Sequence, residues 1–460
     1  MADIRNAAPA PAVPLGVGPV DRPLLAGPGA PDYDNVLACI RCGLCLAVCP
    51  TYSVERVEVQ SPRGRVALIR AVDEGRLPLG SPGFRAHLYH CLDCRACQSI
   101  CPSGVKVGEL VLAARAGVEA SQRPSLLERA IRWLALRLVL TSAERLWLFA
   151  RLLPLYQAVG LQRVIRRSGV LHRLPGGWKV LGVMEDLLPR LSRRPLHAGL
   201  PEVVPARGER RYRVGFFLGC MMSVVLAETS RATVRVLAEN GCEVVTPPHQ
   251  RCCGAPHAEE GDAGSQRRFA RHNVDLFSRY DLDCIVTDCA ACGAETKKYG
   301  HLLADEPKHA EKAAAFSAKV RDVSEFLAGI PLRQPEGSLP ARVTYHEPCH
   351  LCHAQGIRKP PREVLQAIPG VQLVELRESD WCCGSAGVYN ITHAERAEKL
   401  LQRKVRNLKA TQADVVATGN PGCLLQLQAG VRRAGLKTRV AHPIELLDEA
   451  YRGRLQPGAR

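Results

Sequence analysis

Cys39-Ile-Arg-Cys42-Gly-Leu-Cys45-Leu-Ala-Val-Cys49-Pro50 is the stretch that decides how the N-terminal part of the chain folds. A second run, Cys91-Leu-Asp-Cys94-Arg-Ala-Cys97-Gln-Ser-Ile-Cys101-Pro102, repeats its spacing. In this pattern three thiolates of a run hold one [4Fe-4S] cluster, and the fourth cysteine holds the other cluster. We therefore predict two cubane sites with crossed ligand sets, namely Cys39, Cys42, Cys45 and Cys101 at the first, and Cys91, Cys94, Cys97 and Cys49 at the second.

Structural zinc is the alternative for these eight cysteines, since four thiolates at C-x-x-C spacing also suit zinc. Two complete matches favour the cubanes, because a zinc site does not require the fourth ligand to cross between runs.

The C-terminal half carries another cysteine pattern, and this pattern occurs twice. The first copy runs through Arg213-Val-Gly-Phe-Phe-Leu-Gly-Cys220, Arg251-Cys-Cys-Gly254 and Cys284-Ile-Val-Thr-Asp-Cys289. The second has Arg342-Val-Thr-Tyr-His-Glu-Pro-Cys349, Trp381-Cys-Cys-Gly384 and Asp414-Val-Val-Ala-Thr-Gly-Asn-Pro-Gly-Cys423, at offsets of 129, 130 and 134 positions. This spacing predicts an internal duplication of βα units around mainly parallel sheets. The cysteines follow the strands, so they should gather at the carboxyl edge of each sheet.

The two copies differ in their thiol sets. The first predicts a cluster or metal site from Cys220, Cys252, Cys253, Cys289 and Cys292. In the second, Gln426 stands where the last cysteine would be, which leaves a degenerate set of Cys349, Cys382, Cys383 and Cys423. A different cluster, zinc or nothing are the open alternatives there. Adjacent thiolates suit an unusual bridging site, and we expect the following glycine to let the backbone approach the inorganic core.

The predicted fold class is α+β and multidomain. We expect a tail over 1–30, a two-cluster ferredoxin-type domain over 31–120, a helical connector over 121–210, and two duplicated α/β cysteine-rich domains over 211–335 and 336–460. The connector has no cysteine between 121 and 205, and its apolar residues recur at helical spacing at Leu126, Leu127, Ile131, Leu134 and Leu138. Thr141 and Glu144 read as a capping box that opens a helix.

The cell compartment and the net charge narrow the range of possible functions. The start Met1-Ala-Asp-Ile-Arg has no apolar export signal, so we expect the 20 cysteines to stay reduced in the cytoplasm. This also argues against disulfides, and against covalent haem at Cys349-His-Leu-Cys352-His353. No apolar stretch is long enough to span a membrane. The formal charge of +17 leaves open peripheral contact with the cytoplasmic face of the inner membrane.

Taken together, these residues resemble the family that includes the iron-sulfur subunit of glycolate oxidase, lactate-utilisation proteins, and the related subunits of anaerobic glycerol-3-phosphate dehydrogenase and heterodisulfide reductase. The combination of the ferredoxin runs with two CCG segments carries the resemblance. Within this group the C-terminal third is most similar to the glycolate oxidase protein, through Glu347-Pro-Cys-His-Leu-Cys-His-Ala-Gln-Gly-Ile-Arg358, Cys382-Cys-Gly-Ser-Ala-Gly-Val-Tyr-Asn390 and Gly419-Asn-Pro-Gly-Cys423.

The resemblance implies an electron carrier without a catalytic residue of its own, in a complex whose FAD-binding partner subunits oxidise glycolate to glyoxylate. Electrons would then pass to the quinone pool. The chain has no G-x-G-x-x-G fingerprint, which agrees with flavin being bound only by partners. Three alternatives stay open: an electron carrier serving lactate or glycerol 3-phosphate oxidation, a heterodisulfide reductase that uses the CCG cluster, and a zinc-bearing nucleic-acid binder, which the 5% aromatic content disfavours.

Overall fold

The computed structural model describes residues 33–121, 134, 141–175, 179–189, 191 and 200–453. The tail predicted over 1–30 lies outside these residues, as do Leu126, Leu127, Ile131 and Leu138 of the connector. Within the described part of the chain, no helix is both long enough and apolar enough to cross a membrane.

The N-terminal segment is a helical unit built around the two cysteine runs. Its core is formed by fully buried side chains of the three longest helices, among them Ile69, Leu88 and Leu110. Pro62 at the start of α4 follows Ser61, whose hydroxyl accepts a hydrogen bond from the Gly64 amide at 2.9 Å. The elements are α1 (Asp34–Leu37), α2 (Leu44–Ala47), α3 (Pro50–Glu55), η2 (Glu58–Gln60), α4 (Pro62–Asp73), α5 (Pro82–Tyr89), α6 (Ala96–Ser99) and α7 (Val107–Ser121).

The described part of the connector as far as residue 189 is also helical, with α9 (Ala143–Ala150), α10 (Leu153–Ala158), α11 (Leu161–Ser168), η4 (Val170–Arg173) and α12 (Val180–Leu187). The predicted range 121–210 extends too far, because β1 (Val203–Val204) lies within it and pairs as a strand of the first sheet. The predicted capping box is wrong by one residue. Ser142 caps α9, and its Oγ accepts from the Arg145 amide at 3.4 Å. The Thr141 carbonyl accepts a hydrogen bond from the Cys252 amide at 3.2 Å, which ties the start of this helix to the first cysteine-rich half.

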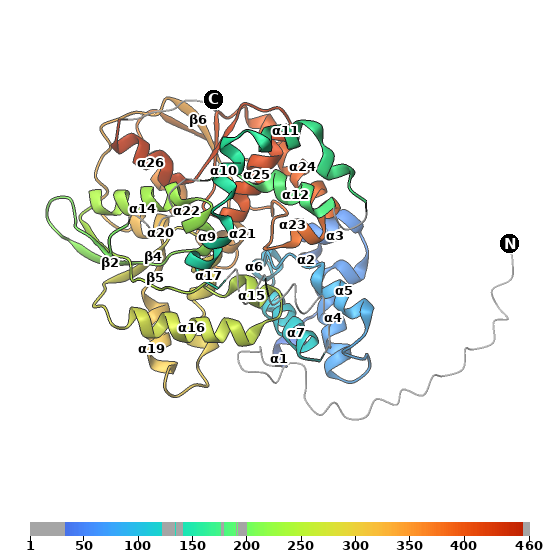
Figure 1. Ribbon diagram of the computed structural model, residues 1–460. Helices are drawn as coiled ribbons and strands as arrows, with labels where there is room; N and C mark the ends of the chain where they lie inside the picture. Colours follow the sequence, from blue (N-terminus) through green and yellow to red (C-terminus); the bar gives the residue numbers. More distant parts are fainter. Residues whose placement is uncertain are drawn as a thin grey trace, which may run out of the picture.

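Two sheets with the same topology form the rest of the molecule (Figure 1). The first has the order β1-β3-β2-β4-β5, in which only β1 is antiparallel. The second has the order β7-β6-β8-β9 and is parallel throughout. Without β1, both sheets place their strands in the order second, first, third, fourth. This shared order and the mixed helix and sheet content confirm the predicted fold class and the duplication.

The elements of the two halves keep the predicted alternation of strand and helix. In the first half they are β1 (Val203–Val204), β2 (Tyr212–Phe216), α13 (Cys220–Val224), α14 (Ala227–Glu239), β3 (Cys242–Val245), α15 (Ala255–Glu259), α16 (Ala263–Phe277), β4 (Cys284–Thr287), α17 (Ala290–Thr296), α18 (Tyr299–Leu302), α19 (Ala310–Lys319), β5 (Val320–Asp322) and α20 (Val323–Ala328). In the second half they are β6 (Ala341–Tyr345), α21 (Cys349–Cys352), α22 (Lys359–Gln366), β7 (Val371–Val374), α23 (Tyr389–Thr392), α24 (Ala394–Thr411), β8 (Val415–Ala417), α25 (Pro421–Arg433), β9 (Arg439–Ala441) and α26 (Pro443–Tyr451).

One hydrophobic cluster joins the two halves. It contains Val214 and Val244 from the first sheet and Val343 and Val415 from the second, together with Leu447 of α26. The central strands are apolar because helices cover both faces of the parallel sheets. Arg235 of α14 makes a two-pronged ion pair with Asp448 of α26, at 2.7 and 2.8 Å. The cysteine-rich halves therefore hold each other in a fixed orientation.

Replacing Leu447 by Ala should lower the free energy of unfolding by about 2–5 kcal/mol, because the side chain is fully buried in the cluster shared by both halves. Leu155→Ala is the matched control, since Leu155 is 62% exposed, and its effect should stay within about 0.5 kcal/mol. Urea unfolding followed by circular dichroism measures both. Equal shifts for the two variants would contradict the shared core.

Candidate metal centres

The structure brings the eight N-terminal cysteines together in two pockets. Each pocket collects three cysteines of one run and the fourth cysteine of the other. The first is lined by Cys39, Cys42, Cys45 and Cys101, and the second by Cys49, Cys91, Cys94 and Cys97, with Cys97 also reaching the first. This grouping is the crossed arrangement that the spacing predicts, although which thiol binds which iron stays a prediction.

Backbone turns shape both pockets in the same way. Arg41 and Gly43 in the first run have φ of 56° and 87°, and the corresponding Asp93 and Arg95 in the second have φ of 46° and 61°. Such left-handed residues within a tight loop form concave turns that suit an anionic group. Three of the four are not glycine, so each of these carries a cost in backbone strain that points to a functional loop.

The chemistry of the donors fits an iron-sulfur cluster in both pockets. Burial raises the pKa of the Cys94 and Cys97 thiols well above the usual value, with neighbouring thiols as a further cause. Thiolates in such a place need the positive charge of a metal. Buried Arg65 adds a cation near Cys49, because its guanidinium donates to Thr51 Oγ1 at 3.2 Å and that hydroxyl lies 3.2 Å from Cys49 Sγ.

In the first cysteine-rich half, five buried thiols form a row at the carboxyl ends of β2, β3 and β4. Cys220 Sγ lies 3.9 Å from Cys252 Sγ, Cys253 contacts Cys252 and Cys292, and Cys289 Sγ accepts from the Cys292 amide at 3.4 Å. Hydrogen bonds from Cys252 and Cys292 lower the pKa of Cys253 to about 7. A metal centre with several thiolate ligands fits this row.

The glycines of the CCG segments let a helix pack closely on each loop, and their expected role of letting the backbone approach an inorganic core stays a prediction. A Cβ on Gly254 would lie 3.1 Å from Gln266 Cγ of α16, and one on Gly384 would lie 2.8 Å from the Ala397 carbonyl of α24. Both residues also have positive φ, of 98° and 89°. A helix that packs closely on each loop therefore requires glycine.

The second half repeats the row with one substitution. Cys349 contacts Cys382, and Cys383 contacts both Cys382 and Cys423. Gln426 does not join them, because its Oε1 accepts a hydrogen bond from Asn390 Nδ2 at 2.9 Å. His346, which the sequence analysis did not single out, does: its ring and the thiols of Cys383 and Cys423 have donor atoms within 4.8 Å of one another.

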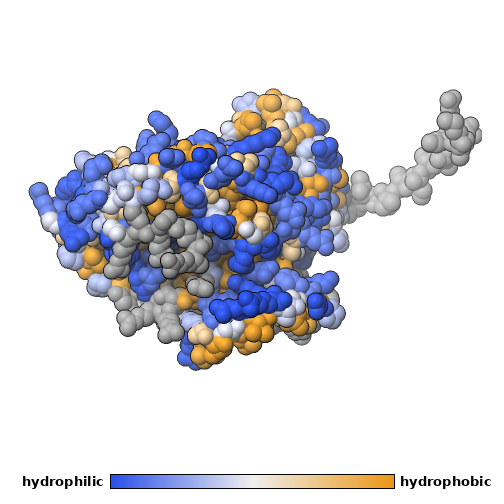
Figure 2. All heavy atoms as spheres, turned by 90° about the horizontal axis from the view of Figure 1, so that it is seen from above, coloured by the Kyte–Doolittle hydropathy of each residue, from blue (hydrophilic) through white to orange (hydrophobic). Residues whose placement is uncertain are grey.

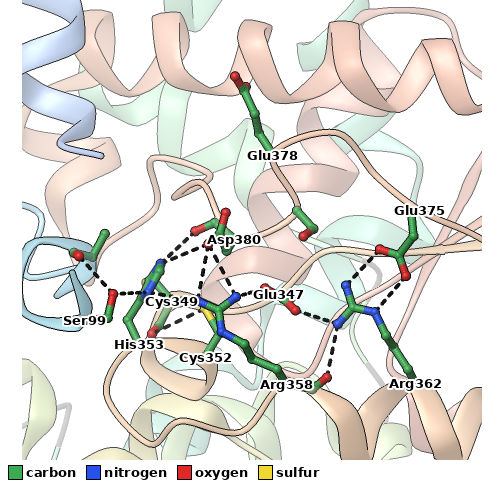
Figure 3. A network of polar contacts seen from close by, with 12 residues as sticks. Ser99, Glu347, Cys349, Cys352, His353, Arg358, Arg362, Glu375, Glu378 and Asp380 are labelled. Atoms are coloured by element: carbon green, nitrogen blue, oxygen red, sulfur yellow. Dashed lines mark hydrogen bonds and ion pairs between the residues drawn. The ribbon is translucent and has the colours of Figure 1, made fainter. Parts of the chain in front are cut away.

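Hydrogen bonds and ion pairs fix the loop after Cys349 (Figure 3). Arg358 and Arg362 both reach the carboxylate of Glu347, at 2.6 and 2.5 Å. His353 lies 3.0 Å from the hydroxyl of Ser99 on the ferredoxin-type unit and 3.2 Å from the Asp380 carbonyl. Cys352 is buried beside this loop and points to the Cys349 carbonyl, outside the row.

The candidate metal sites lie next to one another. Cys94 of the second ferredoxin pocket packs in one apolar cluster with Cys349 and Cys382. Asn420 links the two cysteine-rich halves, because its Oδ1 lies 3.8 Å from Cys289 Sγ and its Nδ2 lies 3.7 Å from Cys423 Sγ. The thiol sets thus form a continuous series through the interior, which is what short-range electron transfer requires.

A helical unit with two four-thiol pockets, joined to two cysteine-rich α/β halves, defines an iron-sulfur electron-transfer protein. Comparison with known families agrees. The 4Fe-4S dicluster domain matches residues 35–105, and the Cysteine-rich domain matches 214–296 and 343–428. The linker region of the glycolate oxidase iron-sulfur subunit matches residues 127–191.

The glycolate oxidase iron-sulfur subunit of Escherichia coli is 32% identical over 427 residues, covering 91% of this chain and 95% of that protein. A Bacillus subtilis protein named "Probable glycolate oxidase iron-sulfur subunit" is 40% identical over 424 residues, with the same coverage. Lactate utilization protein A of Halalkalibacterium halodurans is 32% identical over 243 residues, 53% of this chain and 99% of that protein. The chain belongs to the family of glycolate oxidase iron-sulfur subunits.

Replacing Cys42 by Ala should remove between about one and four iron atoms per chain, because a cubane that lacks one thiolate loses the iron at that corner or falls apart. Cys242→Ala is the control, since Cys242 lies in the sheet core and lines neither pocket. Iron analysis of anaerobically purified protein measures the loss. Unchanged iron in Cys42→Ala, or an equal loss in Cys242→Ala, would contradict the site.

Proposed function

We propose that this chain carries electrons in a flavin-dependent glycolate oxidase complex. FAD-binding partner subunits oxidise glycolate to glyoxylate, and this chain passes the electrons towards membrane quinone. The observation that carries the proposal is the packing of Cys94 against Cys349 and Cys382, which puts the ferredoxin pockets in series with the cysteine-rich sites. The names of the two relatives that align along nearly their whole length supply the substrate.

Within this function, Cys39, Cys42, Cys45 and Cys101 bind one [4Fe-4S] cluster, and Cys91, Cys94, Cys97 and Cys49 bind the other. When bound, each cubane takes up one electron at a time, which divides the two-electron output of a flavin. The protein's part is to position these thiols, all but Cys42 at least partly shielded from water, and to supply cations beside them. The guanidinium of Arg65 lies near Cys49, where it donates to Thr51, and that of Arg115 donates to the Cys91 carbonyl at 2.6 Å.

The surface around the first ferredoxin pocket suits the docking of an electron donor. Cys42 is exposed, and so are the apolar Ile40 and Leu44 beside it, at 69% and 51%, with the exposed Arg41 between Ile40 and Cys42. Arg63 lines the same pocket and is paired with Glu58 at 2.7 Å. An apolar patch with few charges at the mouth of a metal site lets a partner approach closely and exclude water.

The connector provides the surface through which we expect electrons to leave towards membrane quinone. Apolar side chains of α10 and α11 are exposed, among them Leu155 at 62% and Val164 at 62%, and Arg163 and Arg167 lie on the same pair of helices. Figure 2 shows apolar patches between hydrophilic ones on the face seen from above. A surface that combines apolar and basic residues fits peripheral contact with anionic lipid, where quinone resides.

Glycolate added to the anaerobically purified complex should bleach the visible absorbance of the clusters on this chain, and vesicles of anionic lipid that contain quinone should restore it. Lactate and glycerol 3-phosphate serve as comparison substrates and should act at least about tenfold more slowly, because a site fitted to glycolate must also accommodate the extra methyl group of lactate or the longer, phosphorylated chain of glycerol 3-phosphate. Faster bleaching by either of them would overturn the assignment of glycolate.

A second candidate function is reduction of a disulfide substrate at the first cysteine-rich site. It is favoured by a cavity of about 210 Å³ that opens onto Cys220 and Cys252 and is lined by His249, Gln250 and Arg251. A small substrate could reach the thiol row through this opening. The replacement of the last cysteine by Gln426 counts against it, since the second half then lacks a matching five-thiol set.

The purified chain, reduced with a viologen dye, separates the two candidates. Cleavage of a disulfide needs two electrons and two protons and gives two thiols, which a thiol reagent counts. We expect no thiol release above that of the dye alone. Release that Cys253→Ala abolishes, with the iron of the ferredoxin pockets unchanged, would establish the reductase instead.

A further inference from the structure

His346 is a buried imidazole without a polar partner. It follows β6 directly, is fully buried, and is held by its own amide, which donates to the Ala417 carbonyl at 2.9 Å. Neither ring nitrogen has a hydrogen-bond partner among the residues that the structure describes. A buried polar group left unpaired costs about 1–3 kcal/mol, so such a group calls for a ligand.

The ring lies where a ligand would be. A ring nitrogen of His346 and the sulfur atoms of Cys383 and Cys423 all lie within 4.8 Å of one another, and all three residues are buried. Around a single tetrahedral ion, with metal–sulfur bonds of about 2.3 Å and metal–nitrogen bonds of about 2.0 Å, ligand atoms lie about 3.5–3.8 Å apart. Thiolates on separate corners of a cubane lie farther apart, so this spacing favours one ion.

The internal duplication provides independent support. Cys349 lies 129 positions after Cys220, and the same offset relates His346 to Phe217. Phe217 holds the same place in its sheet, because its amide donates to the Val286 carbonyl at 2.9 Å, but its ring stacks on Phe277. The half that has a fifth cysteine, Cys292, thus has no imidazole at this position, while the half that has Gln426 instead gains one.

We propose that His346, Cys383 and Cys423 bind a single thiophilic divalent metal ion, zinc or ferrous iron, in the second cysteine-rich half. His346 takes the place of the fifth cysteine, whose position in this half is occupied by Gln426. Two thiolates and one neutral imidazole around a dication give a site with no net charge, which is the least costly way to bury these groups. Thiolate and imidazole together are ligands that suit both metals.

The neighbouring buried cation does not occupy the space between these three ligands. Lys404 is buried nearby, but its Nζ donates to the backbone carbonyls of Glu378 and Ser379. Cys382 continues the row beyond Cys383, and its sulfur accepts a hydrogen bond from the Gly384 amide at 3.5 Å. The site is separate from the eight ferredoxin thiols and does not depend on which substrate the partner subunits oxidise.

The test counts zinc and iron in the full-length chain purified anaerobically, as wild type and as His346→Gln. The variant should lose about one ion per chain, and the metal that disappears identifies the occupant. The electron paramagnetic resonance of the reduced ferredoxin clusters should be unchanged. His353→Gln is the matched control, because the side chain of His353 in this half is only 5% exposed, but both of its ring nitrogens have partners, Ser99 and the Asp380 carbonyl.

Three results would overturn the proposal: unchanged zinc and iron in His346→Gln, an equal loss in His353→Gln, or a loss of several iron atoms together, which would mean a cluster rather than one ion. If circular dichroism shows that His346→Gln does not fold, His346→Cys decides. A thiol at this position should retain the ion, and a folded His346→Cys chain that lacks it refutes the site.

Discussion

The structure depends on one electrostatic constraint, the burial of many sulfur donors in a single interior. Thiolates without a metal or a nearby cation cannot be kept away from water at acceptable cost. The protein meets part of this demand with its own cations, since Arg65, Arg95, Arg115 and Lys404 are all almost fully buried near the thiols. The formal charge of +17 therefore reflects in part the anionic metal centres that the chain encloses, and it is not by itself a sign of nucleic-acid binding.

The topology of the sheets explains how distant cysteines meet. In both halves the first strand of the unit lies between its second and third strands, and the thiols follow the carboxyl ends of those three strands. Parallel strands place these ends at one edge, where open α/β sheets bind their ligands. Because the halves share a core, their two edges are held together, and Asn420 spans the gap between them. The ferredoxin-type unit covers the same region with the loop around Cys94.

Much of this could be predicted from the sequence because it rests on local spacing. The two ferredoxin runs fix their pockets within short loops, and the repeat of Cys220 at Cys349 predicts the duplication and the position of the cysteines at the carboxyl edge of each sheet. Other features depend on which side chains meet in space. In the sequence, His346 cannot be told apart from an ordinary core residue at the end of a strand. Only the structure shows that its ring nitrogens lack hydrogen-bond partners and that its ring lies close to Cys423. The spacing from Thr141 to Glu144 predicted the cap of α9 one residue too early, because Ser142 also has a capping hydroxyl and spacing alone does not choose between two adjacent residues of this kind.

The crossing of the ferredoxin runs has a consequence for biosynthesis. With three thiols of one pocket before residue 46 and the fourth at Cys101, the emerging polypeptide has no complete binding set until both loops have left the ribosome. The other pocket is completed at Cys97, only four positions earlier. If these thiols bind two cubanes as proposed, neither cluster can have its full ligand set before the second run is synthesised, and the two sets are then completed almost together.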